Sequence, residues 1–329
     1  MTIDATEGGS LVQRATVLGG GTMGLGIAQV LAVAGIDVAL CDASPALTRS
    51  AMERLRQRTR TQVEAGLREP EDMDRVGSVR GCFPPEDAVA ATDLVCEAVP
   101  EDLPLKRSLL HSVSGAAPTE TIIASNTSSF PIDELAEHVH RPQRFLGLHW
   151  FSPPEWVPGV EVIAGSRTAP EVVHDCHLLL RRLGKCPTDV ASSPAFVANR
   201  IQMAMFLEAV SCVEDGLASA EQVDEVVRST FGFRLPNFGP FQIADMAGLD
   251  VYLSVLRTLQ DGVGSRFAPP PRLVELVEQG RFGTKAGAGF GEYSADEGDQ
   301  LMRYRDTRYA AMSRFLSKPL ISDGSDANA

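Results

Sequence analysis

A glycine-rich run near the start of the chain has the spacing of a phosphate-binding turn. The run reads Gly-Gly-Gly-Thr-Met-Gly from Gly19, which fits the pattern G-x-G-x-x-G. In this pattern Gly19 permits a tight turn, Gly21 lets the backbone approach a pyrophosphate, and Gly24 lets a helix pack closely on a strand. Thr22 and Met23 then open a helix whose free amide groups and positive end face the phosphates. Because glycines also mark ordinary turns, the run needs support from its surroundings.

The elements predicted around the run support its interpretation as a phosphate-binding turn. Ala15–Leu18 predicts a buried strand before it, and Thr22–Ala34 predicts a helix after it. A second predicted strand, Val38–Cys41, ends beside Asp42. A carboxylate at that place accepts hydrogen bonds from a ribose diol and repels a 2′-phosphate. The context therefore predicts a dinucleotide site that favours NAD over NADP, although Arg49 in the following helix leaves NADP open.

Four polar side chains could support oxidation of an alcohol beside such a cofactor. This reaction needs a base for the hydroxyl proton and donors that hold the oxygen as it becomes a carbonyl. His149, at the end of a predicted strand, is placed for the first role, and Glu161 on the next strand could hold the imidazole in one tautomer. Ser128 and Asn199 could bond the substrate oxygen. Taken singly, His149 and Glu161 could be a structural pair, and the other two could cap a loop or a helix.

Short apolar stretches alternate with segments of helical spacing in the first half of the chain. The further stretches that predict strands are Leu94–Val99, Thr121–Ser125, Phe145–His149 and Val160–Ala164. Ser44-Pro45 starts a helix, with serine as the N-cap and proline at the first helical position. Strands separated by helices predict a largely parallel sheet covered on both faces, which is an α/β, Rossmann-type doubly wound fold.

The pattern changes after about residue 190. Ser193-Pro194 opens a long helix that ends at Gly216, and Ser219 with Gln222 predicts a capping box for the next helix. This change separates a second, helical part of the chain from the predicted sheet.

We accordingly predict three parts. Residues 1–190 form the NAD-binding domain, and residues 191–295 form an all-helical domain, because no convincing strand follows before Phe290. Residues 296–329 form a C-terminal extension, and its small and polar end, 324–329, is expected to be disordered.

The composition excludes several classes of partner. With 44% hydrophobic and 22% charged residues, the 329-residue chain is long enough for two globular domains. A net charge of −13 argues against nucleic acid and anionic membranes as partners. We expect no signal peptide, because the first fourteen residues lack an apolar core, and Ile27–Cys41 is too short to span a bilayer. Six cysteines without a C-x-x-C pair favour reduced, buried thiols in a cytoplasm over disulfides or a zinc site.

At these residues the sequence resembles the 3-hydroxyacyl-CoA dehydrogenase family. The matches keep the family's order over roughly residues 12–295, and they are GGGTMGLG (19–26), EAVPE (97–101), SNTSS (125–129), GLHWF (147–151), VEV (160–162), VANR (197–200), GPF (239–241), Asp245, GLD (248–250) and FGTKAGAGF (282–290). The resemblance implies that Ser128, His149, Glu161 and Asn199 form the active site. It also implies NAD as cofactor, a 3-hydroxyacyl-CoA substrate in the cleft between domains, and a homodimer joined through the helical domain.

Two acidic residues of the EAVPE motif are further candidates. Glu97 and Glu101 could flank the nicotinamide side of the cleft, so Glu101 is predicted to bind the cofactor. A plain turn explains the motif nearly as well.

The sequence departs from the family pattern where the substrate carrier would be recognised. The family usually has Phe-Asn-Pro after the histidine, whereas residues 150–156 here read WFSPPEW. Large aromatic rings reshape a pocket, and Ser152 lacks the amide that asparagine offers. The basic segment that commonly holds CoA in this family is thin here and rich in acids, and the arginines between Arg49 and Arg68 could touch a CoA phosphate but are expected to form a solvated helix face. A CoA thioester is the first choice, and a carrier-protein thioester or a free 3-hydroxy acid stays open.

Two other classes of protein share parts of this pattern. Dehydrogenases of the 3-hydroxyisobutyrate or 6-phosphogluconate type use a lysine in a glycine-rich helix, and Ser192–Arg200 contains none. A non-catalytic NAD-binding protein would tolerate loss of the four polar residues, all of which are present.

Overall fold

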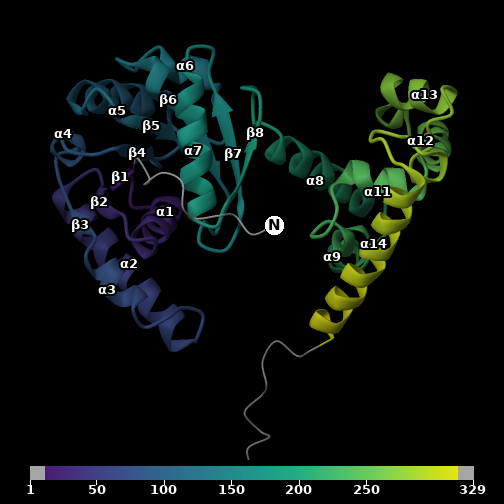
Figure 1. Cartoon of the computed structure of the whole chain (residues 1–329), viewed down its shortest axis with the longest axis horizontal. Coiled ribbons are helices and arrows are strands. Elements are labelled where there is room, and N and C mark those ends of the chain that lie inside the picture. The colour runs from purple at the N-terminus through teal and green to yellow at the C-terminus, as the bar shows by residue number, and fades with distance from the viewer. Residues whose placement is uncertain (1–11, 318–329) are drawn as a thin grey trace, which may run out of the picture. The chain divides into compact units, whose positions relative to one another are not determined.

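Eight strands form one sheet in the first part of the chain, in the order β3-β2-β1-β4-β5-β6-β7-β8 (Figure 1). The computed structural model describes residues 12–317. The strands are β1 (Arg14–Leu18), β2 (Asp37–Cys41), β3 (Arg80–Gly81), β4 (Leu94–Glu97), β5 (Ile122–Ser125), β6 (Phe145–Trp150), β7 (Gly159–Ala164) and β8 (Cys186–Asp189). Neighbouring strands run parallel except β6 and β7, which are antiparallel.

Helices cover both faces of the sheet. They are α1 (Thr22–Val33), α2 (Pro45–Glu64), α3 (Asp72–Gly77), α4 (Pro85–Val89), α5 (Leu103–Ala116), α6 (Ile132–Ala136), the short 3-10 helix η1 (Pro142–Arg144) and α7 (Pro170–Arg182). Apolar side chains of α1, α2 and α7 pack with the sheet in one buried cluster, and those of α4, α5 and α6 pack in another. The predicted Rossmann-type doubly wound sheet is confirmed.

Local sequence explains where two of these helices begin. The Ser44 side chain accepts a hydrogen bond from the Leu47 amide at 3.2 Å, and Pro45 occupies the first turn of α2, as predicted. In the same way, Asp102 accepts a hydrogen bond from the Leu105 amide at 2.8 Å at the start of α5. Each cap satisfies an amide that has no partner within its helix.

The chain divides into two compact units, Met1–Met205 and Phe206–Ala329. The second unit contains the rest of α8 (Ala198–Glu214) and then α9 (Ala220–Ser229), α10 (Phe231–Arg234), α11 (Pro240–Ala247), α12 (Leu249–Gly262), η2 (Ser265–Phe267), α13 (Pro271–Glu278), η3 (Thr284–Ala286) and α14 (Ala295–Leu316). The capping box of Ser219 and Gln222 at α9 is confirmed. A small core of Ala244, Leu249, Leu253, Leu273 and Leu276 holds this helical unit together.

A buried carboxylate fixes the loop before α14. The Asp245 side chain accepts hydrogen bonds from the amides of Phe290 at 3.0 Å and Gly291 at 2.9 Å, and from the Tyr293 hydroxyl at 2.8 Å. Burial, together with this hydrogen bond to an anion, raises the pKa of Tyr293 to about 12. The family-matching residues of this loop therefore have a structural explanation.

Two strands and one helix start differ from the sequence-based expectation. The strands β3 and β8 were not predicted, and α8 begins at Ala198 rather than at Ser193-Pro194. Ala195 and Phe196 have φ angles of 61° and 52°, so the chain is left-handed there and cannot continue a right-handed helix.

The predicted domain boundaries can be compared with the ends of elements in the structure. The sheet ends with β8 at Asp189, close to the predicted boundary at residue 190, whereas the division between compact units falls inside α8. The predicted extension begins as helix α14, and its expected disordered end, 324–329, lies outside the described residues. Within residues 12–317, no helix combines the length and the apolar character that crossing a bilayer requires.

Candidate active site

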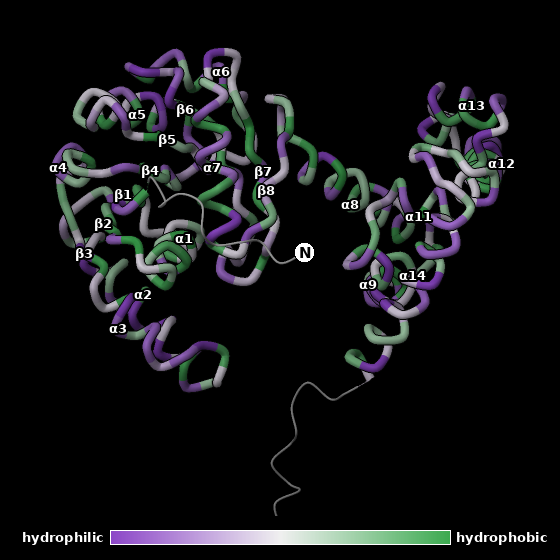
Figure 2. Tube along the Cα trace, viewed as in Figure 1, coloured by the Kyte–Doolittle hydropathy of each residue, from purple (hydrophilic) through white to green (hydrophobic). Residues whose placement is uncertain are grey.

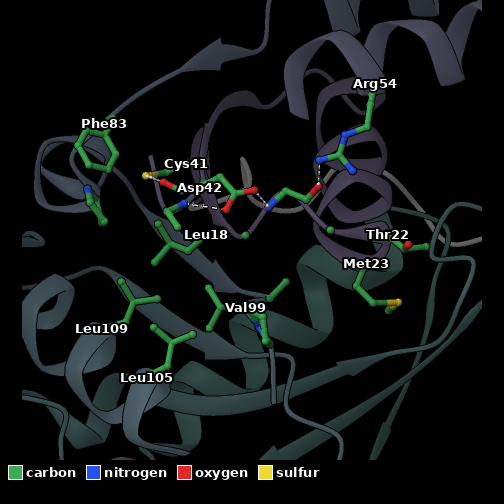
Figure 3. Close-up of a pocket in the computed structure, with 17 residues that line it drawn as sticks. Leu18, Thr22, Met23, Cys41, Asp42, Arg54, Phe83, Val99, Leu105 and Leu109 are labelled. Atoms are coloured by element: carbon green, nitrogen blue, oxygen red, sulfur yellow. Dashed lines mark hydrogen bonds between the residues drawn. The ribbon is translucent and has the colours of Figure 1, made fainter. Parts of the chain in front are cut away.

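A cavity of about 740 Å³ opens at the carboxyl ends of β1, β2 and β4 (Figure 3). Its polar side is formed by the glycine-rich turn with Asp42 and Arg54, and its apolar side by Leu18, Cys41, Phe83, Val99, Leu105 and Leu109. Ligands of open α/β sheets bind at this edge, and a mostly apolar cavity with a few polar groups suits an adenosine.

Two glycines of the turn, Gly19 and Gly24, are required by close backbone contacts. Gly19 has a φ of +106°, and a Cβ there would lie 2.5 Å from the Ala98 carbonyl oxygen. A Cβ at Gly24 would lie 1.8 Å from the Gly19 oxygen, so α1 can approach the turn only with glycine. A Cβ at Gly21 would meet nothing within 4 Å, and no side chain caps the first turn of α1. The uncapped amides at Thr22 and Met23 therefore face space that fits a pyrophosphate.

Asp42 lies where the sequence predicted a ribose-binding carboxylate. Its Oδ2 accepts a hydrogen bond from the Gly20 amide at 3.1 Å, and its Oδ1 accepts one from the Ala43 amide at 2.7 Å. Each carboxylate oxygen has a second lone pair, so the side chain is held in place and can still accept hydrogen bonds from a diol.

His149 and Glu161 form a buried pair on neighbouring strands. They stand directly opposite each other in the antiparallel pairing of β6 and β7, and their side chains are 6% and 7% exposed. His149 Nδ1 lies 2.8 Å from Glu161 Oε2, and Glu161 Oε1 accepts hydrogen bonds from the amides of Val197 and Ala198. An ionised carboxylate can only accept, so Nδ1 carries the proton and Nε2 is left for a ligand. Among residues 12–317, none forms a hydrogen bond with Nε2.

Ser128 and Asn199 form a second contact. Asn199 Nδ2 donates a hydrogen bond to the Ser128 carbonyl oxygen at 3.3 Å. Asn199 directly follows Ala198, whose amide binds Glu161, so the start of α8 connects the two pairs. The structure therefore links all four predicted residues within the first unit.

Glu101 accepts hydrogen bonds from the loop that contains Ser128. Its Oε1 accepts hydrogen bonds from the Ser128 amide at 2.9 Å, from the Thr127 hydroxyl at 2.5 Å, and from the Ser129 amide and hydroxyl at 3.0 and 2.7 Å. Burial alone would raise the pKa of Glu101, but these hydrogen bonds and the charge of Lys106 outweigh it and lower the pKa. The geometry shows a brace for the loop. Glu101 is not among the residues that line the cofactor cavity, so its contact with the cofactor stays a prediction.

Lys106 is a buried cation beside this loop that the sequence analysis did not predict. Its side chain is 1% exposed, and its Nζ lies 2.7 Å from Glu97 Oε1 and 3.2 Å from Glu101 Oε2. Glu97 is fully buried and also accepts a hydrogen bond from Ser125 at 2.5 Å. The spacing of Lys106 from Leu110 and Val113 on the buried face of α5 (i+4, i+7) is the signal that could have revealed it.

The segment after His149 contacts two of the arginines that were expected to form a solvated helix face. Arg49, Arg54, Arg56 and Arg60 are exposed, as expected, whereas Arg58 and Arg68 are partly buried. The Glu155 side chain is 2% exposed and forms an ion pair with Arg58 and a 3.1 Å hydrogen bond with Gln62. Arg68 lies over the ring of Trp156, 5.1 Å from its centroid. Arg58 and Arg68 therefore contact residues 150–156, the segment in which the sequence departs from the family pattern.

Lys185, which directly precedes β8, also binds the segment after His149. Its Nζ donates hydrogen bonds to the carbonyl oxygens of Pro154 and Val157, and burial lowers its pKa. The segment is thus held at both α2 and the turn before β8. Within the described part of the chain, no group of three His, Cys, Asp or Glu side chains is arranged to hold a metal ion. All six cysteines are free, and Cys186 is exposed rather than buried as expected.

Comparisons with known proteins agree with this arrangement. The family models of the NAD-binding domain and the C-terminal domain of 3-hydroxyacyl-CoA dehydrogenase match residues 14–193 and 196–293. A 5-formyl-3-hydroxy-2-methylpyridine 4-carboxylate 5-dehydrogenase of Mesorhizobium japonicum is 35% identical over 93% of this chain and 99% of its own. A protein of Bacillus subtilis named as a 3-hydroxybutyryl-CoA dehydrogenase is 36% identical over 86% of this chain and 98% of its own.

A solved structure is similar over nearly the same length. The crystal structure of a 3-hydroxyacyl-CoA dehydrogenase from Archaeoglobus fulgidus is 32% identical, covers 92% of this chain and 99% of its own, and superposes with a TM-score of 0.76. The family models match both the sheet and the helical unit, and the relatives match over nearly their whole length. The chain therefore belongs to the 3-hydroxyacyl-CoA dehydrogenase family and is an NAD-dependent oxidoreductase.

Proposed function

We propose that this enzyme interconverts a 3-hydroxyacyl thioester, with CoA as the carrier, and its 3-oxoacyl form, and that His149 is the general acid and base. The buried pair of His149 and Glu161 carries the proposal, because it leaves Nε2 as the ring nitrogen that can exchange a proton. The names of relatives such as the Bacillus subtilis protein support the CoA thioester.

The four residues have separate roles in the proposed reaction. His149 Nε2 accepts the hydroxyl proton, and the negative charge of Glu161, 2.8 Å from Nδ1, stabilises the imidazolium that forms. Ser128 and Asn199 hold the substrate oxygen as it becomes a carbonyl. NAD, when bound, supplies the acceptor for the hydride. In the reverse direction His149 returns the proton.

A free or carrier-protein-bound 3-hydroxy acid is a second candidate substrate. The ion pair of Arg58 with Glu155 favours it, because a guanidinium that is paired with a buried carboxylate is less available to a CoA phosphate. The Mesorhizobium japonicum relative, which is named for a pyridine carboxylate, has nearly the length of this chain. The catalytic residues would be the same.

A substrate panel separates the two candidates. We expect NADH formation from 3-hydroxybutyryl-CoA with a kcat/KM at least roughly a hundredfold above that of free 3-hydroxybutyrate, because remote parts of a substrate supply binding energy to the transition state. Initial rates at 340 nm with CoA, pantetheine and carrier-protein thioesters and with the free acid provide the measurement. Preference for an acid or a carrier-protein thioester would replace the CoA proposal, and no turnover of any 3-hydroxy compound would contradict both candidate substrates.

We further propose a homodimer built mainly on residues 190–295. Figure 2 shows hydrophobic residues at several places along helix α8. None of the residues of this helix is buried, and its exposed side chains include Ile201, Met203, Phe206, Leu207 and Val210. An apolar surface of this kind is typical of a protein interface. The resemblance to the family implies a second copy of the chain as the partner.

Replacement of one exposed side chain tests the dimer. Light scattering at micromolar concentration should give twice the chain mass for the parent and a lower mass for Leu207→Asp, whose side chain is 67% exposed in one chain. Leu178→Asp on α7, half exposed in the first unit, is the matched control and should stay dimeric. A monomeric parent would contradict the proposal.

The cytoplasm is the proposed location, and fatty acid metabolism the proposed process. Six free thiols support a reducing compartment, and a 3-hydroxyacyl thioester would be an intermediate of acyl-chain metabolism.

A further inference from the structure

Arg54 is a cation of the cofactor cavity that the family motif does not include. It lies on α2, and its Nη2 donates a 2.8 Å hydrogen bond to the Gly20 carbonyl oxygen in the glycine-rich turn. In residues 12–317 no carboxylate lies within ion-pair distance of Arg54, whereas Arg58, one helical turn later, is paired with Glu155. A guanidinium has five N–H donors, so most of those on Arg54 are available to a ligand.

Arg54 and Asp42 hold the same residue of the turn from two sides (Figure 3). Asp42 accepts a hydrogen bond from the Gly20 amide at 3.1 Å, and Arg54 binds the Gly20 oxygen. A Cβ at Gly20 would lie 2.4 Å from the Ala51 Cβ and 2.7 Å from Asp42 Oδ2, so the turn is packed tightly between them. One anionic and one cationic group therefore line the cavity side by side without forming an ion pair.

We propose that Arg54 binds phosphate on the adenosine side of the cofactor, and that it would also bind a 2′-phosphate if Asp42, the carboxylate already predicted to repel that group, were removed. With NAD, the guanidinium stabilises the negative charge of the pyrophosphate, which also faces the amides of the turn. With NADP, repulsion by Asp42 outweighs the attraction of Arg54. Removal of Asp42 would leave an arginine that suits a 2′-phosphate. The inference concerns the cofactor and does not depend on the substrate proposed above.

Direct binding measurements without substrate test the first part. We expect Arg54→Met to weaken NADH binding roughly tenfold, which is the scale of one charge-assisted hydrogen bond, and Arg54→Lys to weaken it less, since the charge remains. Fluorescence titration gives the Kd values. Arg56→Met is the matched control, because Arg56 lies on the same helix but lines a separate groove with Arg49 and Arg80. It should bind NADH within twofold of the parent.

The second part is tested with NADPH. The parent should bind NADH more tightly than NADPH, and Asp42→Ala should shift the ratio of the two Kd values toward NADPH. In the Asp42→Ala background, Arg54→Met should weaken NADPH binding more than NADH binding, because both cofactors lose a partner of the pyrophosphate and only NADPH also loses a partner of the 2′-phosphate. A parent that prefers NADPH, or a double variant that loses no more affinity for NADPH than for NADH, would overturn the proposal.

Melting temperatures separate this role from a structural one. Arg54 could merely brace the Gly20 carbonyl, in which case Arg54→Met and Arg54→Lys would weaken NADH binding equally and lower the melting temperature of the free protein alike. That result, or NADH binding by Arg54→Met within twofold of the parent, contradicts a role in phosphate binding.

Discussion

Replacement of His149 by alanine should remove most of the turnover while NADH binding stays nearly unchanged. A positioned general base contributes ~10²–10⁴-fold to the rate, so a loss of kcat of that order is expected. The imidazole lies on β6, on the far side of β4 and β5 from the Asp42 end of the cofactor cavity, which explains why binding is spared. Steady-state kinetics and fluorescence titration of NADH on the same preparation provide the two measurements.

Glu161→Gln tests the partner of the base. An amide cannot stabilise an imidazolium as a carboxylate does, so this variant should also lose turnover. The losses of His149→Ala and Glu161→Gln should not add in the double variant, because both act on one proton transfer. Additive losses would indicate two separate roles.

The chain contains a second histidine–carboxylate pair that serves as a control. His177 Nε2 lies 2.6 Å from Asp189 Oδ1, with an exposed aspartate and no part in the site. His177→Ala should keep kcat within a fewfold of the parent. If His149→Ala folds, binds NADH and retains a comparable kcat, His149 only packs against its neighbours Phe151 and Phe196, and the mechanism is wrong.

Sequence patterns were sufficient for those strands that are buried and apolar. Strands such as β1, β4 and β6 have apolar residues on both faces, because helices cover both sides of the sheet. The edge strands gave no such signal. β8 consists of Cys-Pro-Thr-Asp and is mostly exposed, and β3 contains only two residues. Their places in the sheet depend on backbone pairing with β7 and β2, which is independent of side-chain type.

In the site, too, contacts between neighbouring elements could be predicted and contacts between distant parts of the chain could not. The pairing of His149 with Glu161 could be predicted, because two strands that are neighbours in sequence carry the residues at their ends. The contacts of Glu155 with Arg58 and of Arg54 with Gly20 join residues 97 and 34 positions apart. Periodicity within one element contains no information on such contacts, so the partners of Arg54 and Arg58 could not be predicted.

The largest expected loss of stability follows from removal of Lys106. This ammonium lies 2.7 Å from Glu97, and both side chains are almost fully shielded from water. A buried carboxylate that loses its partner destabilises a protein by about 3–5 kcal/mol, so Lys106→Met should lower the free energy of unfolding by that amount. Urea denaturation measures it. Arg107→Met is the control, because the neighbouring pair of Arg107 and Glu134 is over a third exposed and should contribute about 1 kcal/mol or less.

The double variant distinguishes an unpaired charge from lost packing. Glu97→Gln removes the stranded negative charge yet keeps an oxygen that can accept the hydrogen bond of the Val99 amide. Glu97→Gln combined with Lys106→Met should therefore recover about half or more of the lost stability. If the double variant is as unstable as Lys106→Met, the lysine stabilises the protein through its packed methylene chain. The double variant should still turn over more slowly than the parent, because Glu101, which also faces Lys106, holds the loop of Ser128.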